Sequence, residues 1–150
     1  MPTVKDLFAD LVAGTTVWKT QTSTATDAAA KACILGFGSD AAPQFPRMYV
    51  RSMSYRAERY AAEAFDTSGR LRIQIDYARV SGQSTRRGEE EVIDQRVQDL
   101  IDAIVDRSRT TGVLTLRSLE MTQPPRLNIE STETGFWTVE LMAEWPGSRP

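Results

Sequence analysis

The chain has 150 residues, of which 41% are hydrophobic and 25% charged, and its formal net charge is -2. This size and composition are ordinary for one globular domain, which we expect to span residues 1–150. The near-neutral charge excludes a global basic field that would attract nucleic acid or anionic lipid. A lone cysteine, Cys33, excludes an intramolecular disulfide and favours a reducing compartment.

The first residues, MPTVKDLFADLVAG, do not have the pattern of a signal peptide, because two aspartates interrupt the apolar stretch and no basic run precedes it. No stretch approaches the length of apolar sequence that a membrane span needs, so no membrane partner is expected. Only three of the 18 basic residues are lysine. The arginine excess suits a protein that contacts other proteins, but a biased genome composition is the better explanation of it.

Two helices are expected before residue 40. Thr3 can cap the first, in which apolar residues recur at helical spacing until Gly14. The Thr/Ser-rich stretch that follows contains Val17-Trp18, which we interpret as a short extended segment. Thr26 or Asp27 can cap a second, alanine-rich helix over residues 28–37, and a loop with two prolines leads on from it.

Strands are expected next. Residues 47–55 have strand character, and residues 70–80 alternate an apolar face with a wet face that includes Asp76. Residues 56–65 have helical propensity but lie between these two runs, so we interpret them as a continuing, irregular edge strand or hairpin arm. A turn is expected at residues 66–69, Asp-Thr-Ser-Gly.

The clearest helix covers residues 89–109, where apolar residues form one stripe and acidic residues precede basic ones, as the helix dipole favours. Strand patterns follow at residues 113–121, 126–130 and 135–145, the last ended by Pro146-Gly147. The order of elements is therefore α-α-β-β-α-β-β. It predicts an α+β fold with a single antiparallel sheet of about four strands and the helices packed on one face.

Motifs for catalysis are missing from the sequence. There is no histidine, which removes the usual general base and the commonest metal ligand, and there is no glycine-rich phosphate loop. Cys33 is better explained as a small apolar residue than as a nucleophile. The carboxylates of residues 89–91 and 99–106 are better explained as the wet face of a helix than as a metal site. We expect no enzyme activity, no cofactor and no metal.

Two clusters have competing interpretations as contact sites. Arg47, Arg51, Arg56 and Arg59 alternate with tyrosines and approximate a nucleic-acid stripe, although the tyrosines fit better in a core or hairpin. Tryptophans in phase with the apolar face of the last strand are core residues. Phe136 lies on the other face of that strand, so for it an interface anchor and core filling are equally supported.

In pattern and order the chain resembles the tail terminator (tail completion) proteins of long-tailed bacteriophages, prophages and gene transfer agents. The segments that carry the resemblance cover nearly the whole chain and come in a fixed order: VKDLFADLVAG, VWKT, DAAAKACILGF, PRMYVRSMSY, SGRLRIQIDYARV, EVIDQRVQDLIDAIVD and GVLTLRSLEM…PPRLNIES…GFWTVELMAEW. The family has no strict signature motif and no catalytic residues to carry over.

The resemblance implies a structural protein of the virion neck, assembled in the host cytoplasm. Six copies are expected to form a ring on the head-proximal end of the tail tube, ending tube polymerisation and joining the tail to the head connector (stopper) protein. DNA would pass through the lumen without specific binding. Such a ring needs a heterologous, closed interface. Sheet edges and loops are natural places for it, with Arg86, Arg87, Arg56, Arg59 and Phe136 as candidates.

Two other readings stay open. A head-completion or neck connector protein would share the size and the lack of catalysis. A small ligand-binding module outside phage biology would instead require a deep apolar pocket with convergent polar groups.

Overall fold

The computed structural model describes residues 3–35, 45–61, 64–112, 114–129 and 135–148; for residues 35, 52–61, 64–68 and 146–148 it describes the backbone alone. The helices are α1 (Val4–Ala13), α2 (Thr16–Thr22), α3 (Asp27–Ala32) and α4 (Arg86–Thr111). The strands are β1 (Ile34–Leu35), β2 (Arg47–Ala61), β3 (Ala64–Ala78), β4 (Ser118–Met121), β5 (Arg126–Ile129) and β6 (Gly135–Ser148).

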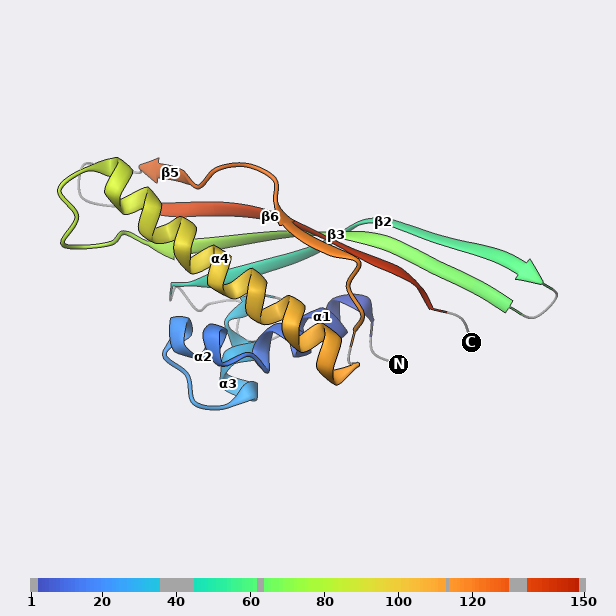
Figure 1. Cartoon of the computed structure of the whole chain (residues 1–150). Coiled ribbons are helices and arrows are strands. Elements are labelled where there is room, and N and C mark those ends of the chain that lie inside the picture. Colours follow the sequence, from blue (N-terminus) through green and yellow to red (C-terminus); the bar gives the residue numbers. More distant parts are fainter. Residues whose placement is uncertain (1–2, 36–44, 62–63, 113, 130–134, 149–150) are drawn as a thin grey trace.

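The described strands form one sheet in the order β1-β2-β3-β6-β4, and β5 also pairs with β6. All pairings are antiparallel except that of β1 with β2. The helices lie on one face of this sheet (Figure 1). The predicted α+β class, with a single, largely antiparallel sheet and helices on one face, is confirmed. The described part of the sheet has six strands rather than about four, because β1 is an additional strand and because two separate strands, β4 and β5, pair with β6 where one was expected.

Helix α1 begins as the sequence predicts. The Thr3 side chain accepts the Asp6 N–H at 3.1 Å, and the Asp6 carboxylate accepts the Thr3 N–H at 2.9 Å, which together form a capping box. These hydrogen bonds with Thr3 lower the pKa of Asp6. The buried face of α1 includes Phe8, Leu11 and Val12. The cap and the apolar face of this helix are therefore both as the sequence predicts.

The expectation that Val17-Trp18 is extended is wrong. Both residues lie in α2, which Thr15 caps by accepting the Trp18 N–H. Trp18 is fully buried, and its indole Nε1 donates to the carbonyl oxygen of Ala30 at 3.0 Å. Threonine disfavours helix, but the burial of one indole against α3 outweighs that weak local preference.

The second predicted helix is shorter than expected. Thr26 caps α3 as predicted, but α3 ends at Ala32. Ile34 and Leu35 then form β1, which pairs in parallel with Met48 and Tyr49. Ile34 is fully buried, so the apolar end of the predicted helix serves as a strand at the edge of the sheet.

Strands β2 and β3 form one long hairpin. Residues 56–61 continue β2, as predicted, and β3 begins at Ala64. The turn predicted at residues 66–69 is wrong: these residues belong to β3, and their register partners include Glu58 for Asp66 and Tyr55 for Gly69. Pairing with β2 overrides the turn preference of Asp-Thr-Ser-Gly. The end of this hairpin, residues 52–61 and 64–68, projects beyond the helices (Figure 1) and is called the arm below.

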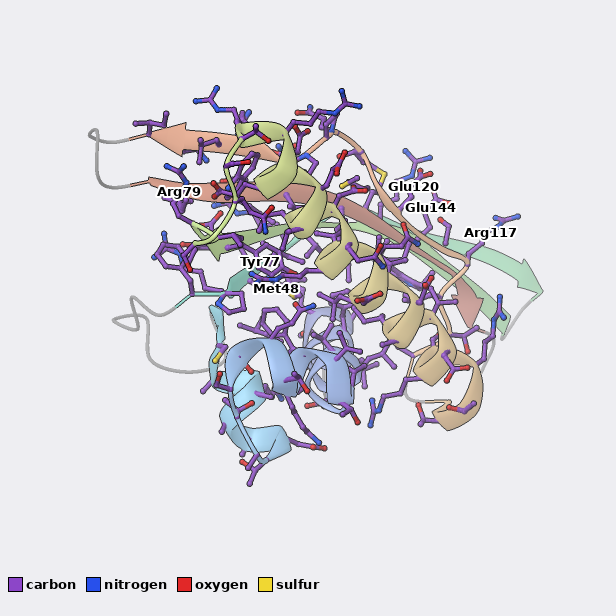
Figure 2. The ribbon with its side chains drawn as sticks, turned by 60° about the vertical axis from the view of Figure 1, so that its left-hand side comes forward. Met48, Tyr77, Arg79, Arg117, Glu120 and Glu144 are labelled. Carbon is purple, nitrogen blue, oxygen red and sulfur yellow. The ribbon has the colours of Figure 1, made fainter. Side chains whose placement is uncertain are left out.

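The core lies between the helices and the inner face of the sheet. Helix α4 contributes Ile93, Val97, Leu100 and Ile104, and β3 contributes Leu71, Ile73, Ile75 and Tyr77, all buried. Burying such a side chain stabilises the fold by about 2 kcal/mol each. Figure 2 shows Met48 and Tyr77 in the layer between the sheet and the helices.

The C-terminal strands differ in extent from the prediction. Within the predicted strand 113–121, residue 113 lies outside the described part, and of residues 114–121 only Ser118–Met121 form a strand. Before it, the Leu114 carbonyl and the Leu116 N–H are both hydrogen-bonded to the Ser108 hydroxyl of α4, which ties this segment to the helix instead of the sheet. The last strand, β6, does not end at Pro146-Gly147 but continues to Ser148, opposite Thr67.

Candidate interaction surfaces

A groove of about 840 Å³ runs between α2 and α4 and is called the α2–α4 groove below. Helix α2 contributes Val17 and Gln21, and α4 contributes Ala103 and its neighbours one turn away. Tyr77 and Ala78, at the end of β3, lie beneath them together with Phe45 and Pro46. The groove therefore has a mainly apolar lining at one end of the longest hairpin.

One wall of this groove is acidic. Asp99, Asp102 and Asp106 follow one another at spacings of three and four residues, which places them on the same face of α4. All three are exposed, and no salt bridge to them occurs among the described residues. With Arg96 as the single lining cation, the groove has a net charge of -2. The prediction that these aspartates lie on a wet face is confirmed, but that face also borders a groove.

Two hydrogen bonds of the Gln21 side chain fix the base of the groove. The Tyr77 hydroxyl donates to Gln21 Oε1 at 2.8 Å, and Gln21 Nε2 donates to the Arg96 carbonyl at 2.9 Å. This chain of contacts joins β3, α2 and α4, so both walls have a defined separation. Burial raises the pKa of Tyr77, which keeps its hydroxyl neutral and able to donate.

Phe136 is not a free anchor. Its ring stacks on Phe45, with the centroids 5.7 Å apart, and the Arg47 guanidinium lies 5.6 Å from the Phe136 centroid and 4.7 Å from that of Phe45. Half-buried in this cluster, Phe136 is mostly committed to contacts within its own chain. It lies opposite Ala78, at the far end of β3 from the arm.

Beside this cluster lies a buried carboxylate that the alternation pattern had assigned to the wet face. Asp76 is 1% exposed. One of its oxygens accepts from Arg47 Nε at 3.1 Å, and the other accepts from Gln74 Nε2 at 3.1 Å and the Thr138 hydroxyl at 3.0 Å. Four strands of the face without helices are thereby joined, because Asn128 of β5 donates to the Thr138 hydroxyl at 2.6 Å.

A second buried carboxylate, Glu89, joins the start of α4 to the sheet. Arg79 donates to its two oxygens at 2.9 and 3.1 Å, and the Val80 N–H and the Trp137 indole also donate to it. The hydrogen bond from Arg79 is the main reason that the pKa of Glu89 falls from 4.5 to about 2; those from Trp137 and Val80 add to it. Sequence reasoning placed Glu89 in a solvated acidic run and missed this role, since Arg79 lies ten residues earlier with no periodic signal.

The four candidate arginines fall into two separate places. Arg86 and Arg87 begin α4 and are exposed, and Arg87 makes only a loose pair with Glu91, at 3.6 Å with both side chains largely in solvent. Arg56 and Arg59 lie on β2 within the arm, and their side chains are outside the described part of the structure. The structure does not gather the five predicted contact residues into one site.

The face of the sheet without helices carries ion pairs between strands. Arg70 meets Glu144 at 2.9 Å, and Arg72 meets Glu140 at 2.8 Å, with both arginines about half exposed. Figure 2 shows Arg117, Glu120 and Glu144 together along the β4 edge. Such exposed pairs contribute at most about 1 kcal/mol each. This face therefore carries positive and negative side chains that are paired with one another.

Within the described ranges, no group of three His, Cys, Asp or Glu side chains is placed to hold a metal ion. Cys33 is half-buried and hydrogen-bonded to the Ala29 carbonyl, and burial raises its pKa, which makes the thiolate less accessible. No helix in the described parts of the chain is both long and apolar enough to cross a membrane.

No family model matches the chain, and a search of the curated proteins finds no match to it.

Proposed function

We propose that the protein is a structural component of a phage neck, a tail terminator that forms a ring on the head-proximal end of the tail tube. In this role it ends tube polymerisation and joins the tail to the head connector, and it has no catalytic function. The proposal rests on the order of elements in the sequence, which resembles the terminator family. It places the protein in the virion, with the tube protein, the connector and copies of itself as partners.

The observation that carries the proposal is the arm. From Arg51 to Ala61, β2 has a described neighbour on one side only, β3, because β1 pairs with Met48 and Tyr49 alone. A long strand edge with free N–H and C=O groups invites pairing or burial. Beyond Thr67, where the described pairing of β3 with β6 ends, the hairpin is a two-stranded ribbon, and such a ribbon alone is at best marginally stable in water. If the subunit works as part of a ring, the neighbouring subunits can cover this exposed strand edge.

A ligand-binding module is the competing function, and the α2–α4 groove is the feature that would serve it. The groove's carboxylates are exposed along a wall instead of converging inside. Every buried side-chain nitrogen and oxygen in the described part has a hydrogen-bond partner, so none of these atoms is left unpaired to bind a ligand. This arrangement fits a protein segment better than a small molecule.

The test is a capping assay with the tail-tube protein from the same genome. We expect the protein to stop tube elongation at about six copies per tube end, with density on one end only in negative-stain images. Tubes that grow to their usual length with a large excess of the protein, with bare ends, would overturn the proposal. Binding to the head connector but not to tube ends would favour the neck connector reading instead.

A further inference from the structure

The acidic wall of the α2–α4 groove has no cation to balance it within the described part of the chain. Asp99 and Asp102 accept hydrogen bonds only from the neutral amides of glutamines one turn earlier on α4, at 2.9 and 3.4 Å. Asp106 precedes Arg107, but that guanidinium donates to carbonyl oxygens at the end of α1 instead. Carboxylates three and four residues apart repel one another, so cations bound along this wall would stabilise α4.

The spacing of these carboxylates matches the repeat of a helix. At the rise of an α-helix, Asp99, Asp102 and Asp106 follow one another along the axis of α4 by about 4.5 and 6 Å. Three basic residues of a second helix that lies alongside, three and four positions apart, have the same two spacings. Side chains on one face of an extended strand are roughly 6.6 Å apart, so a strand would fall out of step with the wall.

The walls of the groove also disfavour an extended occupant. The backbone groups of α2 and α4 are used within those helices, and β3 beneath them is paired with β6 at Tyr77 and Ala78. An extended segment seated here would leave its own N–H and C=O groups without partners, which is costly where water is displaced. A helix satisfies its backbone internally, and Val17 and Ala103 offer it apolar contact on the two walls.

We propose that the α2–α4 groove binds an amphipathic helix of a partner protein, which carries lysine or arginine at three positions of this spacing on one flank and apolar residues beside them. Charge complementarity selects the partner and its register. A helix of a second copy does not meet this requirement, because none of the described helices carries three basic residues at this spacing. The groove lies within one chain, so this role goes beyond the proposed function and does not depend on it.

A labelled synthetic peptide and the full-length chain test this contact. The peptide has about 18 residues, enough for a stable helix, with three lysines at the required spacing beside a stripe of leucines. We expect saturable binding by fluorescence anisotropy, with a Kd in the micromolar range and a gain of helical circular dichroism. Asp102→Asn with Asp106→Asn should weaken binding about tenfold by removing charge. Ala103→Leu should weaken it by about as much, because it fills the groove without a change of charge.

The matched control, Glu91→Gln with Asp94→Asn, removes the same charge from exposed positions of α4 outside the groove and should bind the peptide like the wild type. A second peptide of the same composition, with its lysines spread around the helix, should bind about tenfold more weakly. The proposal is overturned if the first peptide does not bind saturably, if the control variant weakens binding as the groove variants do, or if both peptides bind alike. Self-association of the wild type that the groove variants abolish would assign the groove to a second copy and overturn it as well.

Discussion

Glu89 shows how one buried charge can fix the junction of several elements. It is 4% exposed, and it accepts hydrogen bonds from Arg79, from the Val80 N–H and from Trp137 of β6. A buried carboxylate is tolerated only when its lone pairs are satisfied in this way. The result is a fixed angle between the end of β3 and the start of α4.

Replacing this carboxylate tests its contribution. Glu89→Gln keeps the shape but places an uncharged amide against Arg79, so we expect the free energy of unfolding at pH 7 to fall by about 2 kcal/mol. Urea denaturation followed by tryptophan fluorescence measures it. The control, Glu91→Gln, changes a side chain that is 72% exposed and should be nearly neutral.

The Glu89 carboxylate should also make the free energy of unfolding depend on pH. Its pKa is depressed in the folded state, from 4.5 to about 2, so its stabilising contribution is complete above pH 4.5. That contribution is lost as the pH falls toward 2. We therefore expect the difference in unfolding free energy between the wild type and Glu89→Gln to shrink steadily over this window. A constant difference from pH 5 to pH 2.5 would show that the ion pair is not its cause.

At the scale of elements, the parts that sequence patterns predicted are those in which local and tertiary preferences agree. The structure contains both the apolar stripe of α4 and the alternation of residues 70–78 that the sequence predicted. In both segments the residues that give the periodic pattern are also the ones that pack into the core. α2 and the residues 66–69 were wrongly predicted, since Trp18 burial and pairing with β2 override local preference there. The groove was not predictable, because it depends on how α2 sits beside α4.

The end of α4 depends on one backbone conformation. Gly112 has φ +67° and ends the helix in the left-handed region, where a Cβ would meet nothing within 4 Å. The cost of a substitution there is thus conformational and not steric. We expect Gly112→Ala to lower stability by about 1 kcal/mol and Gly112→Asn to lower it less, because asparagine tolerates this region. Equal thermal shifts for the two variants would contradict this account.

The end of α1 depends on a close approach between elements. The Arg107 guanidinium donates to the carbonyls of Asp10 and Leu11, and a Cβ on Gly14 would lie 2.2 Å from it. We expect Gly14→Ala to destabilise the wild type by about 1 kcal/mol by displacing Arg107. In an Arg107→Ala background the same change should be neutral or slightly stabilising, since φ is -76° at Gly14. A double-mutant cycle measures this change of sign.

At the scale of the whole molecule, a body with its own core carries an arm that projects beyond the helices (Figure 1). The described core residues come from the helices, from Ile34 of β1 and from the parts of β2, β3 and β6 beneath the helices, together with Leu114 and Leu119 beside α4. The register pairs Tyr55 with Gly69, so a two-residue Asn-Gly turn can replace residues 56–68 and close the hairpin.

We expect this shortened chain to keep its helical circular dichroism, with an unfolding temperature within a few degrees of the wild type. It should lose both self-association and tube capping. Retention of either activity would show that the arm is not the contact element. A chain that unfolds would mean that the arm belongs to the body's cooperative unit, which hydrogen exchange on the wild type would confirm independently.

The central position of β3 has a mechanical consequence. A pull on the arm acts along β2 and β3 together, and it loads the hydrogen-bonded ladder between β3 and β6, which runs parallel to that direction. Force in this direction shears many backbone hydrogen bonds at once, whereas force across the strands would break them one after another. A load applied to the end of the arm would therefore be borne along the stiffest axis of the sheet.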